Sequence, residues 1–398
     1  MHGLQIDWNL SLLFYCLDQS GRASVRLRTT LPGRRQAVPG PFVHPESQSR
    51  FPHPRREFDV APHLTPRRRI ALALAAAITG SAALAVSAYA TAEKSDDGAK
   101  AKAAAPSGLN GPYLYLGWGD PPKAADVLKE SGLTQLTMAF VLSDGGCSPA
   151  WDGSRPLEGG QDAETIKSVQ DAGGDVTPSI GGWSGNKLGE ACSSAEELAG
   201  AYQKVIDAYG LKSIDVDIES TEFENAESRQ RVIDALKIVK EKSADTKVYL
   251  TFGTATNGPN DNGKDLIKKG ADAKLDVDGW TVMPFDFGDG TTDMAAATKS
   301  AVDGLAKTVG EAYGISTDDA YRKVGFSSMN GKTDQEGESV SPADFKAMVD
   351  YAKEHHLARA SFWSVNRDRP CSGGGADSCG GIDQEPWEFS KILAGYTG

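Results

Sequence analysis

Leu211-Lys-Ser-Ile-Asp-Val-Asp-Ile-Glu219 lies near the middle of the 398-residue chain, and its alternation of apolar and acidic residues predicts a β-strand. Successive strand residues point to opposite faces, so one face is apolar and the other acidic (Ile214, Val216, Ile218; Asp215, Asp217, Glu219). An exposed acidic edge strand is one interpretation, but the flanking Ile and Val residues are typical of a strand covered by helices. Buried carboxylates are costly unless they are paired. We therefore interpret Glu219 as a catalytic acid whose proton affinity is raised by its acidic neighbours.

The N-terminal part of the chain differs in composition from the rest. Residues 1–66 are rich in Arg and Pro and show no clear periodicity. Residues 67–90 contain three Arg, an apolar run and Ala88-Tyr89-Ala90, the order typical of a secretory signal peptide. A transmembrane helix is the alternative, but the run is short and rich in Ala. We expect a secreted, extracellular protein without membrane attachment after cleavage, and we attribute residues 1–66 to a start codon assigned too far upstream.

Residues 91–110 predict a flexible linker, and residues 111–398 predict a single catalytic domain. The whole chain has 54 acidic and 42 basic residues, and the part from residue 91 onward has 49 and 31, a net charge of −18. This charge suits a soluble secreted protein and argues against nucleic acid or anionic membranes as partners. We expect a monomer.

Four cysteines remain after the predicted cleavage, which suggests two disulfides in an exported chain. Cys371 and Cys379 bracket a short loop rich in Gly and Ser, and this leaves Cys147 to pair with Cys192. A zinc site is the alternative, but paired C-x-x-C spacing is absent from the sequence. The sequence predicts no metal and no cofactor.

Strand-like and helix-like segments alternate from Tyr113 to the end of the chain. The expected strands are 113–119, 135–143, 175–182, 211–219, 247–254, 280–287, 323–329 and 361–366. The expected helices are 124–130, 162–171, 195–209, 224–242, 265–273, 293–313, one that starts at Pro342 with Ser341 as N-cap, and 386–393. Eight such units predict an α/β fold of the (β/α)8 TIM barrel type. A doubly wound sheet is the competing fold, but Gly117-Trp118-Gly119 lacks its glycine-rich phosphate loop.

Unusual residues fall at the carboxyl ends of the expected strands, where a TIM barrel carries its chemistry. Glu219 ends one strand, Ser179-Ile-Gly-Gly-Trp183 and Met283-Pro-Phe-Asp-Phe287 end two others, and Trp363 lies on the last. We therefore expect these residues to converge on one rim.

These motifs resemble glycoside hydrolase family 18, the chitinase family, and most closely its bacterial and archaeal members with a shortened acidic motif. The acidic strand resembles the D-x-x-D-x-D-x-E motif of the family. Other matches are the S-x-G-G motif (Ser179, Gly181, Gly182), the M-x-Y-D motif (Met283, Phe285, Asp286) and the aromatic residue under a sugar subsite (Trp363). Lys212 replaces the first Asp of the acidic motif, at the far end of the strand from the chemistry. Phe285 replaces a Tyr whose hydroxyl helps to hold the substrate's acetamido group.

The resemblance implies hydrolysis of β-1,4 bonds in chitin or N-acetylglucosamine oligosaccharides, with participation of the substrate itself and retention of configuration. It implies Glu219 as the general acid, Asp217 as the residue that orients the 2-acetamido group and stabilises the oxazolinium ion, and Asp215 as a deeper residue that shares a proton or hydrogen bond with Asp217.

The remaining candidates have plainer interpretations. Trp363 is expected under a sugar ring, and a core aromatic is the alternative. Trp118 and Trp183 are weaker candidates for neighbouring subsites. The other tryptophans of the domain are expected to pack in the interior (Trp151, Trp280, Trp387). Asn330 and Asn366 could bond sugar hydroxyls or serve turns. Ser179, Gly181 and Gly182 are expected to be mostly structural. Activity on N-glycans or peptidoglycan, a catalytically silent lectin-like barrel, and a structural or adhesive protein remain alternatives.

Overall fold

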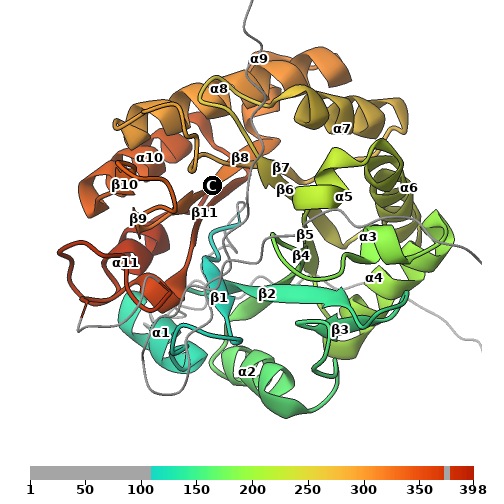
Figure 1. Cartoon of the computed structure of the whole chain (residues 1–398), viewed down its shortest axis with the longest axis horizontal. Helices are drawn as coiled ribbons and strands as arrows, with labels where there is room; N and C mark the ends of the chain where they lie inside the picture. The colour runs from blue at the N-terminus through green and yellow to red at the C-terminus, as the bar shows by residue number, and fades with distance from the viewer. Residues whose placement is uncertain (1–108, 372–376) are drawn as a thin grey trace, which may run out of the picture. The chain divides into compact units, whose positions relative to one another are not determined.

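The computed structural model describes residues 109–371 and 377–398, so the predicted extension, signal peptide and nearly all of the predicted linker lie outside the described residues. Eight parallel strands form a sheet that curves into a barrel (Figure 1). In sheet order they are β1 (Tyr113–Tyr115), β2 (Gln135–Ser143), β4 (Asp175–Gly181), β5 (Ser213–Asp217), β6 (Lys247–Gly253), β7 (Gly279–Met283), β8 (Val324–Met329) and β11 (Arg359–Trp363). Leu109 pairs with Arg359 in parallel fashion just before β1, which brings the two ends of the sheet together. The predicted (β/α)8 barrel is confirmed.

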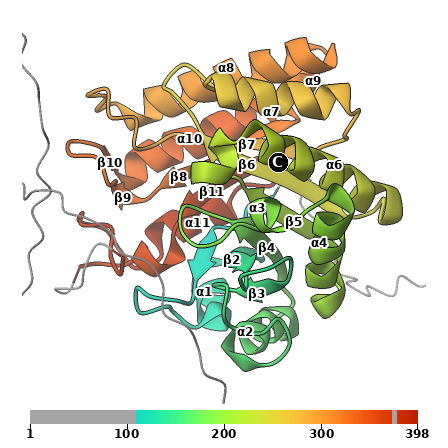
Figure 2. The same ribbon diagram turned by 45° about the vertical axis from the view of Figure 1, so that its right-hand side comes forward.

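Helices cover the outside of the barrel (Figures 1 and 2). They are α1 (Ala124–Ser131), α2 (Gly160–Asp171), α4 (Ala195–Tyr209), α6 (Ala226–Lys242), α7 (Asp261–Asp272), α8 (Met294–Tyr313), α10 (Pro342–His355) and α11 (Glu388–Ala394). The start of α10 follows its sequence signature, because Ser341 and Asp344 cap each other's backbone and Pro342 is the first helical residue.

The structure also contains short elements that the sequence did not predict. They are β3 (Pro149–Trp151), which pairs antiparallel with β2, the hairpin of β9 (Gly331–Lys332) and β10 (Ser339–Val340), the helices α3 (Leu188–Ala191), α5 (Ser220–Glu224) and α9 (Thr317–Tyr321), and the 3-10 turn η1 (Val365–Arg367). The helix predicted over residues 224–242 is present as α6 and begins two residues later than expected. Asn225 is its N-cap, because its side chain accepts hydrogen bonds from the backbone N–H groups of Glu227 and Ser228.

Several predicted strands extended too far at their carboxyl ends. β1 ends at Tyr115, β5 at Asp217 and β7 at Met283. The chain leaves regular pairing at these points; Asp286 beyond β7, for example, has a φ of 52°. Glu219 and Asp286 therefore lie in the turns above the barrel and not within strands.

The alternation of β5 separates two environments as predicted. Ile214, Val216 and Ile218 are buried in the hydrophobic core between the barrel and its helices. Asp215 and Asp217 are buried too, and the bonds of Asp215 reach strands across the barrel interior. The inside of the barrel is therefore polar at this level.

Two disulfides, Cys147–Cys192 and Cys371–Cys379, join the pairs that the sequence predicted. Among the residues that the structure describes, no helix has the length and apolar character needed to span a bilayer.

Candidate active site

Asp215 forms the base of the candidate site and is bonded to four other strands. Its carboxylate accepts hydrogen bonds from the Tyr113 hydroxyl at 2.8 Å, the Ser179 hydroxyl at 2.7 Å and the Thr251 hydroxyl at 2.7 Å. Its fourth partner is the Arg359 guanidinium at 2.7 Å, in an ion pair whose two side chains are completely buried. Asp215 is thus a fixed and fully bonded charge inside the barrel.

Asp217 lies two residues further along β5, on the same face of the strand as Asp215, and its hydrogen bonding differs from that of Asp215. Its Oδ1 atom is buried and has no hydrogen-bond partner among the described residues. Burial raises the pKa of Asp217 well above its usual range, and the neighbouring Glu219 and Asp215 raise it further, against the opposing effect of Arg359 and Lys187. The side chain is therefore poised to bind a proton or a ligand group.

Asp215 has four other hydrogen-bond partners, and the proton or hydrogen bond that we expect it to share with Asp217 stays a prediction. Ser179 holds Asp215 in place through its hydroxyl, a supporting role that agrees with the expectation that this residue is mostly structural. Gly181 does act structurally. A Cβ at this position would overlap the Asp217 carbonyl oxygen, so only glycine lets β4 approach β5 this closely.

Glu219 follows β5 at the barrel rim and is partly exposed. It occupies the N-cap position of α5, although its side chain makes no capping hydrogen bond there. Burial raises the pKa of Glu219 to about 7; Lys187 opposes this, and Asp215 and Asp286 reinforce it. A carboxyl with this pKa is protonated in a large fraction of molecules near neutral pH, as a general acid must be.

The three motif residues at and beyond the end of β7 are Met283, Phe285 and Asp286. Asp286 is held in its turn by the backbone N–H groups of Asp334 and Gln335, which donate to its Oδ1 at 2.9 and 3.2 Å. Burial raises the pKa of Asp286, and its negative charge in turn contributes to the raised pKa of Glu219. The structure thus brings Asp286 to the same rim as Glu219, while Met283 is buried and Phe285 is partly buried.

An aromatic cluster contacts Tyr113, the residue whose hydroxyl bonds Asp215. Trp363 stacks on Phe140 with ring centroids 5.6 Å apart and an angle of 9° between planes, and Trp118 meets Trp363 edge-on at 5.8 Å. Trp363 is partly exposed, Trp118 is 41% exposed, and Trp183 is 71% exposed on the loop that follows β4. Partly exposed rings at a barrel rim offer apolar faces on which a sugar ring can stack.

Comparison with known protein families matches the model described as Glycosyl hydrolases family 18 to residues 113–330, more than half of the chain. The chain belongs to this family. Its matched region begins at β1 and ends directly after β8, and it includes Asp215, Asp217, Glu219 and Asp286.

Individual relatives agree with the family. A probable bifunctional chitinase/lysozyme of Escherichia coli is 25% identical over 315 residues, which cover 74% of this chain and 35% of that protein. Endochitinase 11 of Metarhizium anisopliae is 25% identical over 288 residues, which cover 68% of this chain and 54% of that protein. The chain therefore spans about a third to a half of these relatives. Among solved structures, the catalytic domain of a hyperthermophilic chitinase from Pyrococcus furiosus is 27% identical with a TM-score of 0.66, covering 74% of this chain and 98% of that one.

The first departure from the family 18 motif lies away from the site. Lys212 is largely exposed and pairs with Asp175 at 3.3 Å, at the opposite end of β5 from Glu219. For Asn330 and Asn366 the structure favours the interpretation that they serve the chain itself. Both are fully buried; Asn330 accepts from the Ser364 N–H, and Asn366 donates to the Tyr115 carbonyl.

Trp151 and Trp280 are buried as expected, and Trp387 is partly buried, with its indole N–H donating to Glu130 at 2.6 Å. Sequence reasoning missed four side chains that support the acids: Tyr113, Thr251, Arg359 and Lys187. Arg359 carried a signal, because it shares the inward face of β11 with Ser361 and Trp363. Lys187 lies in a loop before α3 and carried no pattern that would have identified it.

Proposed function

We propose that this chain is a secreted family 18 glycoside hydrolase that cleaves β-1,4 bonds between N-acetylglucosamine units of chitin or chitooligosaccharides, with retention of configuration. One observation carries the proposal. Glu219, whose pKa is raised to about 7, lies two residues beyond Asp217, whose buried Oδ1 has no hydrogen-bond partner among the described residues. The chitinases among its relatives support the substrate class.

Glu219 acts as the general acid in this proposal. Its raised pKa keeps a large fraction of the molecules protonated near neutral pH, so it donates to the glycosidic oxygen as the bond breaks and later takes a proton from the attacking water. Retention follows because the acetamido oxygen of the substrate attacks the anomeric carbon from the opposite face, and no enzyme nucleophile is required.

Asp217 orients that acetamido group. Its buried, unpartnered Oδ1 is the free acceptor that the acetamido N–H needs. The positive charge that develops on the ring favours the ionised form of Asp217, and this carboxylate stabilises that charge in return. Asp215 stays in its ion pair with Arg359 and supplies a constant negative potential below Asp217. Phe285 lacks the hydroxyl that the family places here, so the acetamido group has one donor fewer.

The aromatic cluster binds the sugar rings. We assign Trp363 to the face of the sugar next to the scissile bond, and Trp118 and Trp183 to neighbouring subsites, because these indoles keep exposed surface at or just beyond the carboxyl ends of β11, β1 and β4. The secretion part of the proposal draws on the two disulfides and on residues 67–90, and N-terminal sequencing of the mature protein would test it.

The experiment is hydrolysis of chitotetraose by the purified protein beside Glu219→Gln. We expect turnover by the wild type, at least about a thousandfold less by the variant, and binding of the tetramer by both. Wild-type turnover in Glu219→Gln would refute the assignment of the acid. Binding without turnover in both proteins would favour a lectin-like barrel, and absence of both would direct the search to N-glycans and peptidoglycan.

A further inference from the structure

The loop that follows β4 contains a buried lysine outside the recognised motifs. Lys187 is 2% exposed, and its ammonium donates to the backbone carbonyls of Gly182 and Ser184, the latter at 2.7 Å. No carboxylate lies within ion-pair distance of it among the described residues. An ammonium held in the interior by two carbonyls is costly, so its position calls for an explanation.

Carboxyl groups from three elements act electrostatically on this ammonium. They are Glu222 on α5, Glu219 and Asp217 at the end of β5, and Glu190 on α3. Burial lowers the pKa of Lys187, and these carboxylates oppose that effect. Around Glu219 itself, the other charged groups are Asp217, Asp215 and Asp286, all of them acids. Lys187 is thus the one cation that acts on Glu219 among the charged groups named here.

Backbone hydrogen bonds connect Lys187 to the catalytic strand. The Gly182 carbonyl accepts from Lys187, and the Gly182 N–H donates to the Asp217 carbonyl at 2.8 Å. Two hydrogen bonds and one residue, Gly182, therefore join the ammonium to the backbone of Asp217.

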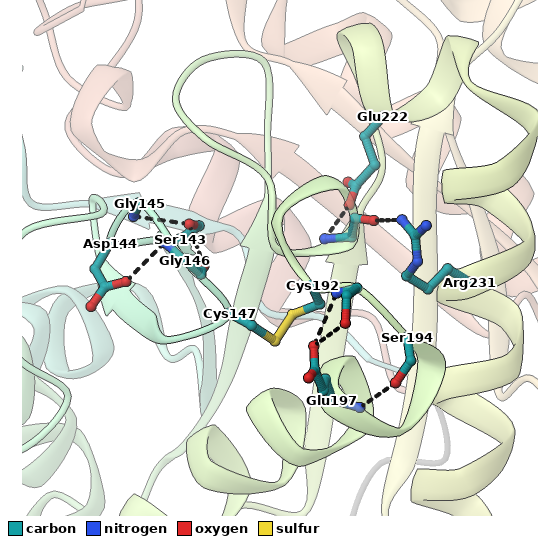
Figure 3. The surroundings of a disulfide bond; sticks show 12 residues. Ser143, Asp144, Gly145, Gly146, Cys147, Cys192, Ser194, Glu197, Glu222 and Arg231 are labelled. Atoms are coloured by element: carbon teal, nitrogen blue, oxygen red, sulfur yellow. Dashed lines mark hydrogen bonds between the residues drawn. A yellow bond between two sulfur atoms is a disulfide. The ribbon is translucent and has the colours of Figure 1, made fainter.

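The other end of the loop is fastened as well. Glu222 accepts from the Gly189 N–H at 2.9 Å, and Arg231 donates to the Gly189 carbonyl at 2.5 Å. Figure 3 shows Glu222 and Arg231 approaching this segment close to Cys192, which the disulfide ties to Cys147. Lys187 is therefore held between two anchored points.

We propose that Lys187 is a positioning residue for the reaction, which stabilises the carboxylate that Glu219 becomes once it has donated its proton. Without this cation, only acids would act on the ionised form of Glu219, and the pKa of Glu219 would be higher. The inference rests on the proposed role of Glu219 and adds a residue to it.

The test is the dependence of kcat/KM on pH for chitotetraose hydrolysis. Lys187→Met removes the charge and keeps the apolar stem, so we expect the basic limb to move to higher pH by about one unit and kcat to fall about tenfold. Lys187→Arg keeps the charge and should leave the limb near its wild-type position. A lower kcat with an unmoved limb in Lys187→Met would mean that the lysine only supports the loop, and would overturn the proposal. Should Lys187→Met fail to fold, Lys187→Gln keeps a donor for the two carbonyls, lacks the charge and should shift the limb in the same way.

Glu222→Gln is the matched control. It removes the neighbouring buried acid and keeps the acceptor for Gly189, so the basic limb should stay in place. A limb displaced by Glu222→Gln would show that the profile reports Glu222, which would overturn the inference. Turnover retained by Glu219→Gln would overturn the proposed function together with this inference. Loss of turnover in Glu219→Gln, combined with an unmoved basic limb of the pH profile in Lys187→Met, would overturn this inference alone.

Discussion

Arg359→Met should destabilise the barrel severely, because it leaves the Asp215 carboxylate buried without its cation. The two side chains are 2.7 Å apart and fully buried, and Arg359 also donates to the Thr251 hydroxyl at 2.9 Å. Removing one partner of a buried ion pair costs about 3–5 kcal/mol, and the lost hydrogen bond to Thr251 adds about 1 kcal/mol. We therefore expect the free energy of unfolding to fall by about 4–6 kcal/mol, measured by guanidinium denaturation at pH 7.

A double-mutant cycle separates the ion pair from simple loss of packing. Asp215→Asn alone leaves the Arg359 charge buried, whereas Asp215→Asn with Arg359→Met leaves no net charge inside the barrel. The double variant should be less destabilised than the sum of the single variants by about 2–3 kcal/mol. A loss below about 1 kcal/mol in Arg359→Met, or strictly additive single variants, would show that the pair is not the stabilising contact that its geometry indicates.

Three further predictions concern neighbouring parts of the site. Burial raises the pKa of Glu222 to about 7, so this group stabilises the folded state fully below about pH 4.5 and loses that contribution as pH rises through 7. The free energy of unfolding of Glu222→Gln should therefore increase by about 2–3 kcal/mol relative to the wild type between pH 5 and pH 8, measured by urea denaturation at both pH values. Equal pH dependence in both proteins would contradict this. Trp183→Ala should raise KM for chitotetraose about tenfold with an unchanged melting temperature, since the ring is exposed and supports no core, and an unchanged KM would remove Trp183 from the subsites. Replacing Cys147 and Cys192 by Ser opens a closure of 45 residues and should cost about 3–4 kcal/mol; unaltered thermal stability in non-reducing buffer would show that the bond does not constrain the chain.

The sequence was sufficient to predict the barrel because its strands and helices follow local rules. The alternation of β5, the capping of α10 by Ser341 and the pairing of the cysteines all appear in the structure. The strand ends were predicted less well. Residues such as Asp286 look like continuations of a strand, but side-chain and backbone bonds to distant loops bend them out of it. Such bonds depend on chain segments about 50 residues away, which periodicity does not report.

The support of the acids was the least predictable feature. Asp215 gathers partners from β1, β4, β6 and β11, and Lys187 comes from a loop without periodic structure. A single serine, threonine or tyrosine on a strand is unremarkable until closure of the barrel turns all of them toward one point. Only Arg359 stood out in retrospect, as a charge on the inward face of β11.

The two acids of β5 and Glu219 just beyond its end, which alternate in the sequence, have three different environments. Asp215 is paired with the Arg359 guanidinium and accepts from four hydrogen-bond donors in all, whereas Asp217, two residues further along β5, has a buried oxygen with no partner among the described residues. Glu219, higher still, depends for compensation on Lys187, with which it makes no ion pair among the described residues. The stabilisation of carboxylates by cations thus weakens from the barrel interior to the rim. Glu219 at the rim can therefore hold a proton for the substrate, while Asp215 in the interior keeps its negative charge. A strand with three chemically similar acids can in this way supply an anchor, a ligand and an acid.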